Sequence, residues 1–318
     1  MAMKLGFFLS CEEYGPRELV EQAKAAERAG FHALWISDHY HPWNREQGQS
    51  PFVWSVIGAL AGAGVRLPVT TAVTCPTMRI HPAVIAQAAA TSAALLEGRF
   101  ALGVGTGEAL NEHIFGDAWP QADVRIEMLE EAIEVMRSLW SGDTVSHSGR
   151  HYRVEHAKLF TVPEEPPAVH ISGFGPKSVD LATRVGDGFV TTSPDRESID
   201  RFKDGGKTRP VQAGTKVCFG PDARDAVATA HRIWPNDALP GELAQVLPTP
   251  EHFEQAAELV TREMVAELVP CGPDLDAHVD SLGQYAEAGV DELFVQQIGG
   301  RHDQFFAAYA SDVIPRFS

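Results

Sequence analysis

The sequence predicts an α/β protein with the (β/α)8 fold, a TIM barrel with inserted segments, and two observations carry this prediction. Short apolar or β-branched runs recur through the chain, and segments with a helical period separate most of them. This alternation is typical of a barrel, with an open doubly wound sheet as the alternative fold. The expected strands are residues 4–9, 33–37, 68–73, 100–105, 168–172, 188–192, 215–220 and 292–298.

Two of the helical segments have clear ends. The first begins at Pro16, continues through an alanine-rich body and stops at Gly30. The second has Asp123 as the expected N-cap and Gly142 just past its end. One stripe of this second helix is apolar, formed by Val124, Met128, Ala132, Met136 and Trp140.

The chain is expected to form a single domain over residues 1–318 with two inserted segments. Residues 141–168 alternate polar and apolar side chains around Ser148 and Gly149, which predicts a hairpin. Prolines separate short helical stretches in residues 221–273, which predicts a helical subdomain before the last strand.

Composition excludes several classes of protein. The net charge is −17, with 43 acidic against 26 basic residues, a poor match to a nucleic acid backbone. The four cysteines lie far apart without a CxxC pair, which favours a reducing compartment. The N-terminal apolar run is too short for a secretory signal, and no stretch approaches a membrane span. We therefore expect a cytoplasmic protein that binds neither nucleic acid nor membrane.

Polar side chains follow several of the expected strands, where barrel enzymes build their active sites. An acidic and a basic side chain, Asp38 and His39, follow the second strand, and the carboxylate of Glu108 follows the fourth. If these three side chains lie at the same end of the barrel, they are candidates for proton transfer. The strand ends are Ser37-Asp38-His39, Thr74-Cys75, Thr106-Gly107-Glu108, Ser172-Gly173 and Thr191-Thr192-Ser193.

The stretch "ISDHYHPW" (36–43) also allows other interpretations. His39 and His41 could bind zinc or iron, but a metal needs further ligands. The other strand ends offer no histidine except His113 and His302, at uncertain positions. We therefore expect no metal. Alternatively, Asp38 and His39 could simply form hydrogen bonds with backbone groups at a loop corner.

Two glycine-containing turns are further candidates. "GVGTGEALNE" (103–112) is either a tight strand-to-helix turn or a place where Gly105 and Gly107 admit a flat ring to the backbone. It lacks the Lys-Ser/Thr of a P-loop and misses GxGxxG by one position. "HISGFGPKSVD" (170–180) opens a helix with little side-chain bulk, so it is either a plain turn or an anion site.

The chain resembles a known group on five motifs. "SDHYHPW", "AVTCPTMRIHPAVIAQAAAT", "RFALGVGTGEALNE", "RHYRVEHAKLF" and "GDGFVTTS" are similar to the deazaflavin-dependent glucose-6-phosphate dehydrogenases. That group lies within the luciferase-like oxidoreductases. The resemblance implies a barrel with insertions, a homodimer and coenzyme F-420, an 8-hydroxy-5-deazaflavin that exchanges hydride without activating oxygen.

The resemblance also implies roles for individual residues. His39 resembles the histidine beside the reacting centre, Trp43 the aromatic residue that covers the substrate, and Glu108 the acid that exchanges a proton with the ring. The peptide bond Ala72–Val73 is expected to be cis. The positions implied at the cofactor are Asp38, Val73, Cys75, Thr106, Gly107, Asn111, Ser172, Gly173, Phe174 and Gly175.

The chain departs from the group at positions that concern the substrate. Residues 191–198 and 261–272 lack the lysines with which the sugar phosphate enzymes hold phosphate, and Cys75 replaces a threonine. We expect an alcohol or carbonyl substrate, a sugar or sugar phosphate, with glucose 6-phosphate a poor one. The alternatives are an FMN-dependent monooxygenase and a non-catalytic deazaflavin carrier. A substitute anion site could come from Arg196, or from Lys203, Lys207 and Arg209 if residues 203–210 close over the barrel mouth.

Overall fold

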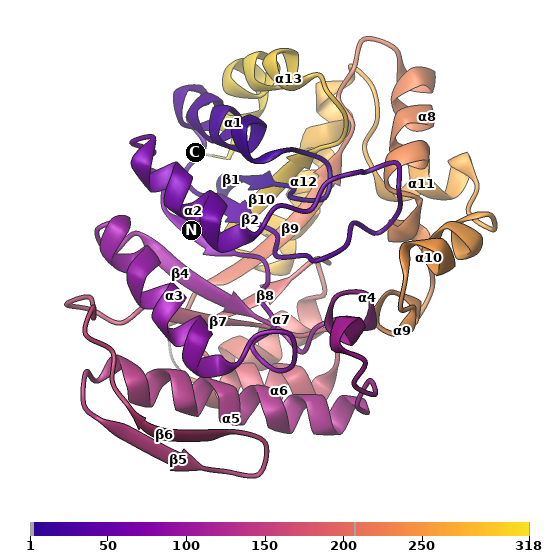
Figure 1. Cartoon of the computed structure of the whole chain (residues 1–318). Helices are drawn as coiled ribbons and strands as arrows, with labels where there is room; N and C mark the ends of the chain where they lie inside the picture. The colour runs from indigo at the N-terminus through magenta and orange to yellow at the C-terminus, as the bar shows by residue number, and fades with distance from the viewer. Residues whose placement is uncertain (1–2, 207, 318) are drawn as a thin grey trace.

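A closed barrel of parallel strands forms the centre of the molecule in a computed structural model that describes residues 3–206 and 208–317 (Figure 1). Around the barrel the strand order is β1-β10-β9-β8-β7-β4-β3-β2. The predicted (β/α)8 fold is confirmed. The barrel strands are β1 (Lys4–Leu9), β2 (Leu34–Ile36), β3 (Val69–Thr71), β4 (Phe100–Val104), β7 (Ala168–Ser172), β8 (Gly188–Thr191), β9 (Val211–Val217) and β10 (Glu292–Gln297).

Helices pack around the outside of the barrel. The first begins at Pro16 and is closed by Gly30 in a left-handed conformation, as the sequence predicts. The N-cap of α5 is Gln121, so the expected cap Asp123 lies instead in the first turn, where its charge suits the helix dipole. The helices are α1 (Pro16–Ala29), α2 (Val53–Gly62), α3 (Pro82–Leu95), α5 (Ala122–Trp140), α6 (Pro176–Val185), α7 (Arg196–Lys203), α12 (Leu275–Ala288) and α13 (His302–Ala308).

Aromatic rings close the interior of the barrel. Trp35 and Phe294 stack with ring centroids 4.5 Å apart. Gly6 and Gly214 make room for them, because a Cβ atom at Gly6 would collide with the Phe294 ring and one at Gly214 would lie 2.5 Å from the Trp35 ring. The Trp35 indole donates a hydrogen bond of 3.0 Å to Gln212. The mouth of the barrel is the end at which the strands have their carboxyl ends. Polar residues that face inward between these rings and that end therefore lie at the mouth.

The seventh barrel strand is displaced from its predicted position. It was expected over residues 215–220, but β9 runs from Val211 to Val217. Its outward residues Val211, Ala213 and Val217 are fully buried, whereas Gly214 interrupts the apolar run that sequence reasoning relied on. This register places Lys216 opposite Gln296 of β10, near the mouth.

Both long connections contain secondary structure. The predicted hairpin is present as β5 (Val145–Ser148) and β6 (Arg153–Ala157), an antiparallel pair beside α5 (Figure 1). The later segment forms α8 (Ala223–Ile233), α9 (Leu243–Val246), α10 (Pro250–Ala257) and α11 (Arg262–Leu268), which lie together at the right of Figure 1. A small apolar core that includes Ala230, Trp234 and Val265 holds this helical segment together.

Residues 203–206 and 208–210 do not close over the mouth, so the alternative in which this segment provides an anion site there is wrong for them. They lie between α7 and β9 and therefore at the opposite end of the barrel. Lys203 donates to the Gly289 carbonyl at 2.6 Å. Lys207 lies outside the described residues. Arg209 is held beneath α6 by hydrogen bonds to the carbonyl groups of Ala182, Thr183 and Gly186.

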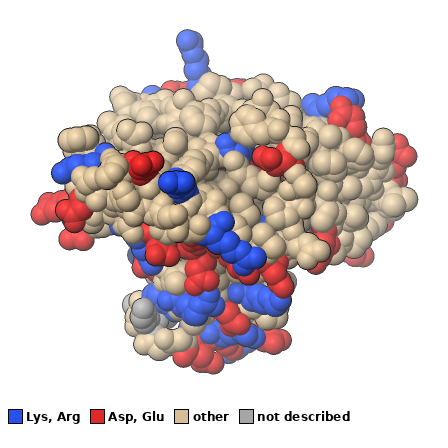
Figure 2. Space-filling view, turned by 60° about the horizontal axis from the view of Figure 1, so that its bottom comes forward, with Lys and Arg blue, Asp and Glu red and all other residues tan. Residues whose placement is uncertain are grey.

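The surface carries mixed charge. Figure 2 shows Lys and Arg side chains interspersed with Asp and Glu on one face, without a broad basic area. Within residues 3–206 and 208–317, no helix is both long enough and apolar enough to cross a bilayer.

Candidate active site

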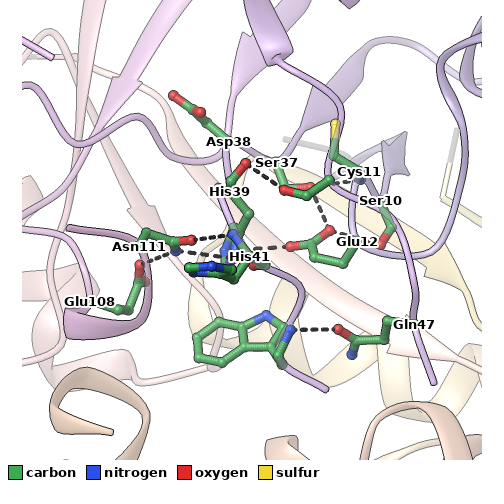
Figure 3. Close-up of polar contacts among 12 residues, drawn as sticks. Ser10, Cys11, Glu12, Ser37, Asp38, His39, His41, Gln47, Glu108 and Asn111 are labelled. Carbon is green, nitrogen blue, oxygen red and sulfur yellow. Dashed lines mark hydrogen bonds and ion pairs between the residues drawn. The ribbon is translucent and has the colours of Figure 1, made fainter. Parts of the chain in front are cut away.

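The His39 imidazole, in the loop after β2, forms the centre of a polar cluster at the barrel mouth (Figure 3). Its Nε2 atom lies 3.4 Å from Oε1 of Glu12. Its Nδ1 atom lies 3.1 Å from both the His41 carbonyl and the Asn111 side-chain nitrogen. The carbonyl can accept a hydrogen bond and the amide nitrogen can donate one, so either ring tautomer of His39 finds a partner at Nδ1. Such an imidazole is suited to proton transfer.

Glu12, in the loop after β1, is a buried carboxylate that sequence reasoning missed. Its Oε2 atom accepts hydrogen bonds from Ser10 at 2.9 Å and from Ser37 at 2.6 Å. The other oxygen remains for His39. Applying the strand-end rule to the first strand as well would have found Glu12, because it follows the residues of β1 closely.

Asn111 connects the two loops that carry the predicted acid and base. Its Oδ1 atom accepts from the backbone amides of Tyr40 at 2.8 Å and His41 at 3.1 Å. Its Nδ2 atom points to His39 and lies 3.4 Å from Oε2 of Glu108. Glu108 is the N-cap residue of α4 (Ala109–Glu112) and is only half-buried, so its carboxylate stays accessible from the mouth.

Trp43 forms the wall between this cluster and the helical segment. Its ring centroid lies 5.0 Å from that of His39 and 5.0 Å from that of Phe253 in α10. Its backbone amide donates to Gln47 at 2.9 Å, which fixes the loop. The structure thus brings His39, Trp43, Glu108 and Asn111 together.

Asp38 points away from His39 into a buried ion network (Figure 3). Thr74 and Arg79 each donate to one of its carboxylate oxygens at 2.9 Å. The backbone amide of Arg79 also donates to Glu112 at 2.8 Å, and its Nε atom lies 3.5 Å from the same carboxylate. Burial raises the pKa of Glu112 to about 7, although Arg79 acts to lower it. Sequence reasoning missed both Arg79 and Glu112.

The ends of β3 and β4 pack against each other through glycine. A Cβ atom at Gly105 would lie 2.8 Å from Val73, and one at Gly107 would lie 2.6 Å from the Cys75 sulfur. The Ala72–Val73 peptide bond is cis, as expected. Burial raises the pKa of Cys75 well above its ordinary value, so it is a neutral thiol. The glycines thus have a packing role in addition to any contact with a ligand, and Thr106 between them is half-exposed.

The turn Ser172–Gly175 connects β7 to α6 and leaves backbone amides available. Gly173 donates to Val190 at 3.3 Å, and Gly175 donates to the Ser178 hydroxyl at 3.3 Å. The amides of Phe174 and Lys177 make no hydrogen bond within the described part of the chain. The exposed turn therefore offers N–H groups to an anion at a helix N-terminus. No hydrogen bond among the described residues joins it to His39.

The described residues contain no group of three or more His, Cys, Asp or Glu side chains arranged to hold a metal ion. His41 instead contacts the Leu110 carbonyl at 3.0 Å, and His113 contacts the Ala109 carbonyl at 2.7 Å. Burial lowers the pKa of His302 to about 4, and its ring lies against Tyr14.

Comparisons with known proteins agree with this geometry. Residues 3–292 match the model of the luciferase-like monooxygenase family. The chain is 36% identical over 332 residues to the F-420-dependent glucose-6-phosphate dehydrogenase of Mycobacterium tuberculosis H37Rv, covering 99% of this chain and 98% of the relative. The enzyme of that name from Microbacterium testaceum is 33% identical over 327 residues, with coverage of 99% and 97%.

Two solved structures are also similar. An F-420-dependent secondary alcohol dehydrogenase in complex with an F-420–acetone adduct has a TM-score of 0.92 and 30% identity, with both chains fully covered. The F-420-dependent tetrahydromethanopterin reductase of Methanopyrus kandleri has a TM-score of 0.80 at 19% identity, a likeness of fold alone, with both chains fully covered.

Proposed function

We propose that this chain, which belongs to the luciferase-like monooxygenase family, is a coenzyme F-420-dependent oxidoreductase that transfers hydride between the cofactor and an alcohol or carbonyl substrate. The observation that carries the proposal is the set of contacts in which Asn111 links His39, with its buried partner Glu12, to the accessible carboxylate of Glu108. The deazaflavin-dependent dehydrogenases among its relatives and neighbours support the cofactor. The glucose-6-phosphate dehydrogenases support a sugar or sugar phosphate as substrate, and the secondary alcohol dehydrogenase supports an alcohol.

The residues at the mouth fit a deazaflavin with an anionic tail. The free amides of Phe174 and Lys177, in the turn with Ser172, Gly173 and Gly175, suit the tail phosphate. We assign the edge of the ring to Asp38, Val73, Cys75, Thr106, Gly107 and Asn111. When bound, the deazaflavin supplies the hydride acceptor or donor, and the protein supplies orientation and proton transfer.

Each side chain of the cluster has a proposed task in alcohol oxidation. His39 removes the hydroxyl proton, and Glu12 orients the ring and stabilises the imidazolium that forms, as an acidic partner does for a catalytic histidine. Glu108 donates or accepts a proton on the side of the site where the cofactor would bind. Trp43, packed on His39, covers the substrate and excludes water.

We also propose that the protein is a cytoplasmic homodimer that binds no nucleic acid, and that residues 1–318 act as one domain with insertions at about 141–168 and 221–273. The excess of acidic residues supports the absence of nucleic acid binding, and the four free cysteines support a reducing compartment. Arg196 is not proposed as an anion site, because it is exposed, donates to the Glu287 carbonyl at 3.4 Å and pairs with Asp200.

Turnover tests the function directly. With oxidised F-420 and a panel of alcohols and sugars, the protein should bleach the visible absorption of the deazaflavin, and deuterium at the alcohol carbon should appear on the reduced cofactor. Reduction of the cofactor without transfer of the label would contradict direct hydride transfer. Oxygen-dependent turnover with reduced FMN would instead favour a monooxygenase.

A further inference from the structure

We infer that the mouth contains a second polar cluster, formed by Lys216, Asn236, Asp237 and Gln296, which binds the hydroxyl groups of a neutral polyhydroxylated substrate and disfavours a phosphorylated one. We name it the Lys216 cluster. The inference rests on the proposed function and specifies its substrate class.

Lys216 faces the interior of the barrel just above the aromatic floor. Along β9 the even-numbered residues point inward, since Gln212 bonds Trp35 and Gly214 lies against the same ring. The Lys216 ammonium lies 4.2 Å from the Trp234 ring centroid and 2.8 Å from Asp237. Its side chain is 19% exposed and that of Asp237 is 25% exposed, so both remain accessible to a ligand.

Hydrogen bonds connect the Lys216 cluster to Glu13, in the loop that also carries Glu12. Glu13 accepts from Gln296 at 2.9 Å and from the Trp234 indole at 2.5 Å. Glu13 is the chain neighbour of Glu12, which contacts His39. The Lys216 cluster therefore lies on the β9 and β10 side of the mouth, whereas Glu108 follows β4 across the barrel. We propose that a substrate reacting at His39 extends toward the Lys216 cluster.

Two buried acceptor atoms show what kind of ligand suits this side. Gln296 is 1% exposed and Asn236 is 7% exposed, and the amide oxygen of each has no hydrogen-bond partner among the described residues. Their orientations are set by carboxylates, because Gln296 donates to Glu13 and Asn236 donates to Asp237 at 3.4 Å. A buried acceptor requires a donor. A sugar hydroxyl is a donor as well as an acceptor, whereas an ionised phosphate only accepts.

Charge leads to the same substrate class. The positive charge of Lys216 is already matched by Asp237. Glu12 and Glu13 follow β1 and Glu108 follows β4, so their carboxyl groups belong to the same end of the barrel. A phosphate dianion would have to displace Asp237 and approach these acids, whereas a neutral polyol would accept from Lys216 and donate to Asp237 without separating the pair.

Substitution of the acid gives opposite expectations for the two substrate classes. We compare glucose with glucose 6-phosphate, which differ only in the phosphate, for wild type, Asp237→Asn and Lys216→Met. Wild type should favour glucose. Asp237→Asn should lower kcat/KM for glucose and raise kcat/KM for glucose 6-phosphate. The ratio of the two values should shift by about 10-fold or more, since a charged partner is lost. Lys216→Met should lower kcat/KM for glucose.

Calorimetric binding of both sugars, with and without F-420, provides a second readout. Lys203→Met is the matched control, because Lys203 lies at the opposite end of the barrel. Wild-type preference for glucose 6-phosphate, an unchanged ratio in Asp237→Asn, or no binding of glucose would each overturn the inference. Failure of the proposed function would appear separately, as absence of F-420 binding in every variant.

Discussion

Replacement of Glu108 by Gln should slow hydride transfer by roughly 100-fold or more while changing the affinity for F-420 little. The substitution keeps the shape of the side chain and its contact with Asn111, but it removes the titrating group at the mouth. Stopped-flow measurement of deazaflavin reduction at saturating substrate separates this step from binding.

The control is Glu127→Gln on the exposed face of α5, where the side chain pairs with Arg150 and His151 of the hairpin region. It should behave as wild type. An unchanged transfer rate in Glu108→Gln would remove Glu108 from the mechanism. A large loss of F-420 affinity with normal transfer at saturation would make Glu108 a binding residue only.

Replacement of Arg79 by Met should lower the free energy of unfolding by about 3–5 kcal/mol at pH 8, because it leaves buried carboxylates without their cation. Arg79 contacts Asp38 and Glu112, and the side chains of all three are at most 6% exposed. Urea unfolding measures the loss. Arg79→Lys keeps a positive charge and should lose less.

The loss should depend on pH in a defined direction. The pKa of Glu112 is raised to about 7, so protonated Glu112 is favoured by folding and its contribution is present in full below its ordinary pKa. That contribution is lost as the pH rises through about 7. Without Arg79, ionisation of Glu112 is opposed further, so the deficit of Arg79→Met should be smaller at pH 5 than at pH 8. Equal deficits, or a deficit under about 1 kcal/mol at both pH values, would contradict a buried ion network.

Seven of the barrel strands could be predicted from apolar runs, because strands buried on both faces are nearly continuous in apolar residues. The remaining strand, β9, was misplaced because Gly214, which admits the Trp35 ring, interrupts its run. That error also concealed Lys216. With the strand expected to begin at 215, Lys216 belonged to the far end of the barrel rather than to the mouth.

Site residues could be predicted from the sequence only where an ionisable side chain directly follows a strand, as with His39 and Glu108. The Asp38–Arg79–Glu112 network joins residues 41 and 33 positions apart, and no spacing rule relates them. Trp234 and Asp237 reach the mouth through the packing of the helical segment, which depends on tertiary contacts. Their chain positions alone give no sign of this.

Equilibrium titration of the purified protein with F-420 and with FMN tests the central claim most directly. A site with free amides at the turn before α6 and an acid–base cluster at the mouth should bind F-420 with a dissociation constant in the micromolar range or below. FMN should bind far more weakly. Equal or preferred binding of FMN would contradict the account and favour a flavin-dependent monooxygenase.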